Sequence, residues 1–63
     1  MDYKVEYKRT TDEEWSVDGY FPSALSAVMF AFEEAYESSH YETRVLQDDE
    51  VVAEFKPMRK EGF

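Results

Sequence analysis

The chain opens with a strict alternation of apolar and polar side chains. Tyr3, Val5 and Tyr7 alternate with lysine and glutamate, which is the two-residue period of a strand with one buried face. After a polar stretch rich in turn-forming residues, Trp15 and Val17 repeat this alternation. The two segments therefore predict an antiparallel hairpin whose aromatic side faces the core.

The dipeptide Asp18-Gly19 lies near the end of the second segment and is compatible with two structures. It can form a tight two-residue turn, but the flanking segments would then be only a few residues long. We therefore predict a bulge or a strand exit, in which the glycine supplies a positive φ angle.

Residues 22–39 have the pattern of an amphipathic helix. Pro22-Ser23 predicts its start, because proline cannot continue a strand and the serine hydroxyl can accept from the free amides of the first turn. The helix is predicted to run to about Ser39. Apolar residues at i, i+3, i+4 and i+7 form one stripe that requires a sheet to cover it. This predicted core stripe comprises Leu25, Val28, Met29, Phe32, Ala35 and Tyr36.

Two more alternating segments follow the helix, and residues 47–50 form the turn between them. Their predicted core-facing residues are Tyr41, Thr43, Val45, Val51, Ala53 and Phe55. The predicted fold class is α+β, with the order ββαββ and a four-stranded antiparallel sheet that carries one helix packed across one face. Residues 1–56 are predicted to form a single domain. Residues 57–63 are predicted to form a short C-terminal tail that is mobile unless Phe63 docks.

The charges are strongly segregated along the chain. Twelve carboxylates lie between Asp12 and Glu54, where Arg44 is the only basic residue, so this stretch carries 12 minus 1, or eleven negative charges. Both ends are slightly basic, and the total is −8. Such a field repels phosphate and anionic membranes and steers the chain toward basic proteins. The predicted partner is a basic protein, with no direct binding of nucleic acid or membrane.

Candidate chemistry is sparse. The run Asp48-Asp49-Glu50 lacks the staggered oxygens and the glycine of a calcium loop, and we interpret it as a solvated turn. His40 has no cysteine or second histidine with which to share a metal ion. So short a chain also leaves little room for a water-excluding pocket. We therefore expect no enzyme activity, no metal and no cofactor, and the absence of cysteine favours a reducing cytoplasm.

The acidic residues form three candidate binding clusters. On the predicted helix Phe30 points away from the core stripe, and Glu33, Glu34 and Glu37 follow it at i+3, i+4 and i+7. An aromatic side chain ringed by carboxylates is a candidate hot spot for a basic partner, although Phe30 could instead pack on a loop or on the tail. The two predicted hairpin turns supply the other clusters, Asp12, Glu13 and Glu14 in the first and Asp48, Asp49 and Glu50 in the second.

The small size, the acidic surplus, the absence of cysteine and the lack of catalytic groups resemble small phage-encoded inhibitors that mimic nucleic acid, namely anti-restriction and anti-CRISPR proteins. The resemblance implies an inhibitor that occupies the nucleic-acid-binding groove of a basic partner in the cytoplasm of a bacterial host. Helix carboxylates roughly 5 to 6 Å apart can take the place of phosphates in such a groove, with Phe30 as an apolar anchor.

A small acidic adaptor is the alternative function. Its acidity would serve solubility, and it would bind a protein through an apolar patch or a sheet edge. Either protein is expected to be a monomer or a small homo-oligomer. Salt separates the two functions, because a phosphate mimic loses affinity as ionic strength rises while an apolar contact hardly responds.

Overall fold

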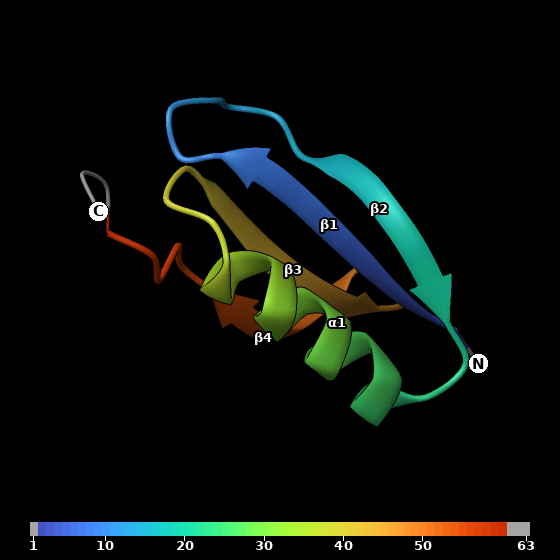
Figure 1. Cartoon of the computed structure of the whole chain (residues 1–63). Helices are drawn as coiled ribbons and strands as arrows, with labels where there is room; N and C mark the ends of the chain where they lie inside the picture. Colours follow the sequence, from blue (N-terminus) through green and yellow to red (C-terminus); the bar gives the residue numbers. More distant parts are fainter. Residues whose placement is uncertain (1, 61–63) are drawn as a thin grey trace.

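A computed structural model describes residues 2–60 as a single sheet of four strands with one helix across one face (Figure 1). The elements are β1 (Tyr3–Arg9), β2 (Ser16–Phe21), α1 (Ala24–Tyr36), β3 (Tyr41–Gln47) and β4 (Glu50–Phe55). All neighbouring strands are antiparallel, in the order β2-β1-β3-β4. The predicted α+β, ββαββ fold is confirmed. The two hairpins join through β1 and β3, so β2 and β4 are the edge strands.

The core lies between α1 and the two central strands. Ala27 and Ala31 are completely buried and pack in one cluster with Val5 of β1 and Val45 of β3. The small alanine side chains let the helix backbone approach the sheet closely. The hydroxyl of Thr43 on β3 donates a 2.7 Å hydrogen bond directly to the carbonyl of Ala31.

The predicted rotation of the helix about its axis is wrong. The fully buried positions are Ala27, Ala31 and Ala35, at i, i+4 and i+8. Of the predicted core stripe, Ala35 is buried as predicted and Val28 packs against the core, but the other members face outward. A line of large side chains would hold the helix away from the central strands, whereas a line of alanines permits close contact and keeps the interior dense. Four of the six residues predicted to be core are exposed instead: Leu25, Met29, Phe32 and Tyr36.

A β-bulge in β2 changes which of its side chains face the core. Val5 lies opposite Gly19, but Glu6 lies opposite Val17, so Asp18 is an extra residue in the ladder. The predicted bulge is confirmed, although Gly19 does not have the positive φ angle that we expected. One extra residue moves the preceding side chains to the other face of the sheet. Val17 therefore lies on the open face, contrary to prediction, and is 48% exposed.

The turn between β3 and β4 is formed by Asp48 and Asp49, which have φ angles of 50° and 67°. Positive φ at both central residues is the geometry of a two-residue hairpin turn, and aspartate tolerates it better than most side chains. A second register shift follows, because Val45 pairs with Ala53 while Leu46 pairs with Val51. Val51 therefore lies opposite a residue of the open face, not on the predicted core side.

Both ends of α1 are capped by side chains or by distant backbone. The hydroxyl of Ser23 accepts from the amide of Ser26 at 3.2 Å, which confirms the predicted helix start. The helix ends at Tyr36, three residues before the predicted position. Beyond β4, the amide of Met58 donates to the carbonyl of Ala35 at 2.9 Å, so the described part of the predicted tail is bound to the helix end. Phe63 lies outside the described residues.

Candidate functional site

The exposed apolar residues of α1 line up along its outer side. Leu25, Met29, Phe32 and Tyr36, spaced at i, i+4, i+7 and i+11, are 70, 53, 41 and 60% exposed. Helical geometry places these positions above one another on one face. We call these four residues the apolar stripe. Scattered single apolar residues are normal on a surface, whereas contiguous ones mark a contact site.

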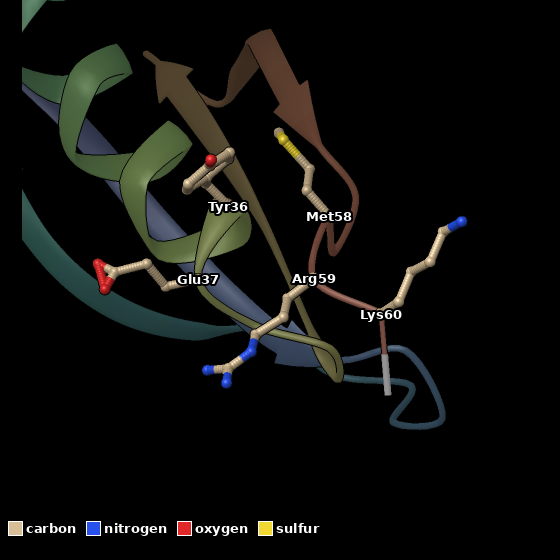
Figure 2. A pocket seen from close by; sticks show the side chains of 5 residues that line it. All are labelled: Tyr36, Glu37, Met58, Arg59 and Lys60. Carbon is tan, nitrogen blue, oxygen red and sulfur yellow. The ribbon is translucent and has the colours of Figure 1, made fainter. Parts of the chain in front are cut away.

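Two residues from the C-terminal part of the chain extend the stripe. The ring of Phe32 stacks on Tyr36 with centroids 5.7 Å apart and meets the ring of Phe55 of β4 edge-on, also at 5.7 Å. Met58, which is 40% exposed, lines a surface hollow of about 540 Å³ beside Tyr36 (Figure 2). The apolar surface is therefore continuous from the helix to the residues that follow β4.

The rim of the stripe is charged. Glu33 and Glu37 are exposed and, by helical spacing, lie along one side of it. The hollow lies at the C-terminal end of the stripe, and its charged lining residues are Glu37, Arg59 and Lys60 (Figure 2). Residues 24–32 of the helix carry no charge. Acidic groups thus flank only the second half of the stripe.

Phe30 occupies a different environment from the one predicted. Its ring contacts that of Phe21 at the end of β2, with centroids 5.0 Å apart, and it packs against the buried cluster. Because the true core face is the alanine face, Phe30 fills the space between α1 and the edge strand β2. This position removes the exposure on which its predicted role as an apolar anchor depended.

The three predicted acidic clusters do not meet on one surface. The turn with Asp12, Glu13 and Glu14 follows β1, whereas the turn with Asp48 and Asp49 lies next to the start of β1. A strand of seven residues is roughly 20 Å long, so the two turns lie at opposite ends of the sheet (Figure 1). All members of both turn clusters, Glu50 included, are exposed.

Glu34 faces the bulge of β2, in a hollow that Glu37 also lines. Its carboxyl lies beside that of Asp18, in a hollow of about 470 Å³ that is also lined by Tyr7 and Tyr41. Burial raises the pKa of Glu34 to about 7, and the hydrogen bond to Asp18 and its negative charge add to the rise. Asp18 Oδ2 is buried and has no hydrogen-bond partner within residues 2–60. Below this pKa, the protonated Glu34 carboxyl is available as a donor to Asp18.

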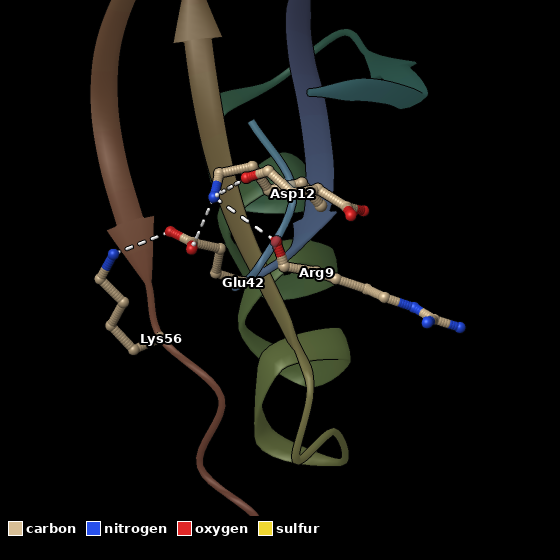
Figure 3. Close-up of polar contacts among 5 residues, drawn as sticks. Arg9, Asp12, Glu42 and Lys56 are labelled. Atoms are coloured by element: carbon tan, nitrogen blue, oxygen red, sulfur yellow. Dashed lines mark hydrogen bonds and ion pairs between the residues drawn. The ribbon is translucent and has the colours of Figure 1, made fainter. Parts of the chain in front are cut away.

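The open face of the sheet carries an ion-pair network around two buried carboxylates. Glu42 accepts from Lys56 at 2.8 Å and from Lys8 at 3.1 Å (Figure 3). The hydrogen bond from Lys56 is the main cause that lowers the pKa of Glu42, and Lys8 adds to it against the effect of burial. Glu6 accepts from Arg44 at 2.7 Å. Five charged side chains therefore meet in cross-strand ion pairs on this face: Glu6, Lys8, Glu42, Arg44 and Lys56.

Trp15 covers part of this network. The guanidinium of Arg44 lies 4.2 Å from the centre of the indole ring, and the amine of Lys8 lies 5.3 Å from it. Both are cation–π distances. The prediction that Trp15 contributes to the core is wrong, for the same reason as for Val17. The sequence shows basic residues in β1 and β3 that can contact an aromatic ring. Their contact with Trp15 cannot be predicted from it, because that contact depends on the bulge.

The remaining predicted site features add no chemistry. Among residues 2–60, no group of three or more histidine, aspartate or glutamate side chains is arranged to hold a metal ion. The same part of the chain contains no helix of the length and apolarity that crossing a bilayer requires. His40 lies at the turn before β3, where its amide donates to the hydroxyl of Ser38 at 3.1 Å.

No protein-family model, curated protein or solved structure matches this chain.

Proposed function

We propose that this protein is an acidic protein-binding module that docks a basic partner protein through the apolar stripe of α1. The observation that carries the proposal is the exposure of four large apolar side chains in one continuous line, 41 to 70% each. A chain of 63 residues can bury only part of its surface, so leaving four large apolar side chains outside the core forgoes stability. Their exposure supports a role in binding, and the proposal includes no catalytic step.

The size and rim of the stripe fit a protein contact. Large side chains each have on the order of 200 Å² of surface, so the exposed fractions leave roughly 450 Å², which lies within the range for the largest patch of a typical monomer, a patch that is often functional. Glu33 and Glu37 beside it add attraction for a basic surface, which raises the association rate and helps to select the partner.

Mimicry of nucleic acid is a second candidate, and one observation favours it. Eight of the nine carboxylates predicted to replace phosphates are exposed: Asp12, Glu13, Glu14, Glu33, Glu37, Asp48, Asp49 and Glu50. Such a protein would inhibit a nucleic-acid-binding partner, as the anti-CRISPR and anti-restriction proteins that it resembles do. The positions of the two turns at opposite ends of the sheet would require a long basic groove, and Phe30 would take no part.

One set of variants separates the two candidates. Proteins captured from a bacterial lysate are identified by mass spectrometry, purified, and titrated with the wild-type chain and three variants. Met29→Gln shortens the apolar surface without a change of charge. The variants Glu33→Lys with Glu37→Lys and Glu13→Lys with Glu14→Lys each add four positive charge units, the first pair beside the stripe and the second in a distant turn.

For docking through the stripe, Met29→Gln should weaken binding at least tenfold, and the helix pair of reversals should weaken it more than the turn pair. For mimicry, Met29→Gln should have little effect, and duplex DNA should displace the protein from its partner. Full binding by Met29→Gln together with displacement by DNA would contradict the docking proposal. Circular dichroism of each variant verifies that the fold is intact.

A further inference from the structure

We propose that in the free protein the apolar stripe is covered by the stripe of a second copy, with the two α1 helices packed antiparallel across a two-fold axis. This inference goes beyond the proposed function, because it concerns the same surface but a different occupant. The two contacts exclude each other, so a partner protein would have to bind the monomer.

The area of the stripe matches what a weak specific dimer needs. Roughly 450 Å² of exposed apolar surface on each copy, from the side-chain areas and exposed fractions given above, amounts to about 900 Å² when both are buried, which is close to the roughly 1,000 Å² of a weak specific interface. Met58 lies beside Tyr36 and enlarges the surface that a second copy would cover. A two-fold contact requires that the same patch complement itself, and a straight stripe along one helix does so.

The shape of the stripe favours the antiparallel orientation. The stripe runs over twelve residues, from Leu25 to Tyr36, or roughly 16 Å along the helix axis. In an antiparallel pair, Leu25 lies near Tyr36 of the second copy, and Met29 lies near Phe32 of the second copy. Each contact then joins an aliphatic side chain to an aromatic ring, so the flexible chains can fill the space beside the rings.

The charges favour the same orientation. Residues 24–32 are uncharged, and Glu33 and Glu37 are the exposed acidic residues of the second half and the end of the helix. An antiparallel pair places these carboxylates beside the uncharged half of the second helix, near its N-terminus, where the helix dipole attracts negative charge. A parallel pair would bring the glutamates of both copies together, and like charges at that distance repel.

The first test is the mass of the purified protein in solution. Sedimentation equilibrium should show a shift from 7.5 kDa toward two copies, or 15 kDa, as the concentration rises. Met29→Gln should raise the dissociation constant of the dimer at least tenfold, because it places an amide in the centre of the contact while keeping helix propensity. Val17→Thr, which makes an equally exposed apolar residue polar on the other face of the sheet, should leave it unchanged.

The orientation is tested by cross-linking, for which a chain without native cysteine is well suited. An equimolar mixture of Leu25→Cys and Tyr36→Cys should form the mixed disulfide on mild oxidation, while Leu25→Cys alone should not link to itself. Efficient self-linking of Leu25→Cys would contradict the antiparallel arrangement, because the disulfide requires Cα atoms within about 7 Å.

Salt distinguishes this dimer from the proposed partner complex. Two copies of charge −8 repel each other, so added salt should strengthen the dimer, whereas it should weaken the complex with a basic protein. A chain that remains a monomer at all concentrations and salt levels overturns the dimer and leaves the partner proposal intact. A salt-strengthened dimer that captures no partner would support the dimer and contradict the partner proposal.

Discussion

At the residue scale, two glutamates show how surroundings decide the state of a carboxyl group. Glu42 lies between two lysine amines, which favour its ionised form. Glu34 lies beside Asp18, where burial and a second carboxyl favour the protonated form. Both residues are glutamates, and the fold makes them different, because it places Glu42 of β3 between two lysines and Glu34 of α1 beside the bulge of β2. The spacing of Glu33, Glu34 and Glu37 does not reveal this difference, because the contact of Glu34 with Asp18 depends on the fold.

Glu34→Gln should stabilise the protein at pH 8 and have little effect at pH 4. The pKa of Glu34 in the folded state, about 7, lies above the unfolded value of about 4.3. Stability is therefore complete below the unfolded value and is lost as the pH rises through 7 and Glu34 ionises. Glutamine cannot ionise, and its amide can still donate to Asp18 Oδ2.

The measurement is the melting temperature of both proteins at several pH values between 4 and 8. Glu33→Gln, at the exposed neighbouring position, controls for the loss of one negative charge. A gain for Glu34→Gln that is the same at pH 4 and pH 8 would show that ionisation of Glu34 does not cost stability.

At the element scale, the alternation of apolar and polar residues predicts the four strands, and the helical spacing after Pro22-Ser23 predicts the helix between them. These patterns do not predict correctly which side of β2 and of α1 faces the core. In β2 the alternation of Trp15 and Val17 continues in phase with Phe21 only if no residue is inserted, and the bulge at Asp18 is that insertion. Such a bulge depends on the pairing with β1, which local pattern does not contain.

The rotation of α1 about its axis differs from the prediction for another reason. Its largest apolar residues form a regular stripe, and its alanines form another, so two faces compete for the sheet. The hydrophobic criterion favours the larger residues, but the close contact between Ala31 and Thr43 requires small ones. The sequence does contain a signal for this face, namely the i, i+4, i+8 spacing of Ala27, Ala31 and Ala35. A criterion that considers only large apolar residues does not detect it.

Phe30→Ala should destabilise the domain more than Phe32→Ala, the reverse of what the predicted core stripe implies. Phe30 packs against the buried cluster and Phe21, and its removal leaves a cavity that costs roughly 3 kcal/mol. Phe32 is 41% exposed and loses mainly its contacts with Tyr36 and Phe55. Urea unfolding of both variants measures the difference. Equal losses would mean that both rings contribute equally to the core.

At the scale of the whole molecule, two opposing electrostatic effects are superimposed. The ion pairs of the open face hold Glu6 and Glu42, which are only 8 and 7% exposed, next to basic partners. The exposed acidic clusters have no such arrangement and leave a surplus of eight negative charges on a small domain. Local attraction therefore occurs within a field that opposes compactness. The balance between them is measurable, because salt screens exposed charges more than buried ones.

We expect the melting temperature to rise when salt is increased from 0.01 to 1 M, over which the Debye length falls from roughly 30 to 3 Å. Repulsion among the exposed carboxylates acts over longer distances than the ion pairs of Glu6 and Glu42, so its screening should dominate. The measurement requires a protein concentration at which the chain is monomeric, because salt would also favour the proposed dimer.

The variant Glu13→Lys with Glu14→Lys provides the matched control. It reduces the net charge from −8 to −4, since each reversal adds two positive units, and both positions are exposed in a turn. Its melting temperature should therefore depend less steeply on salt than that of the wild-type chain. A wild-type protein that melts at lower temperature in high salt would show instead that the ion pairs of the open face outweigh the repulsion. The negative charge would then reduce the stability of the fold very little. A role in binding would not be needed to explain why the chain keeps this charge.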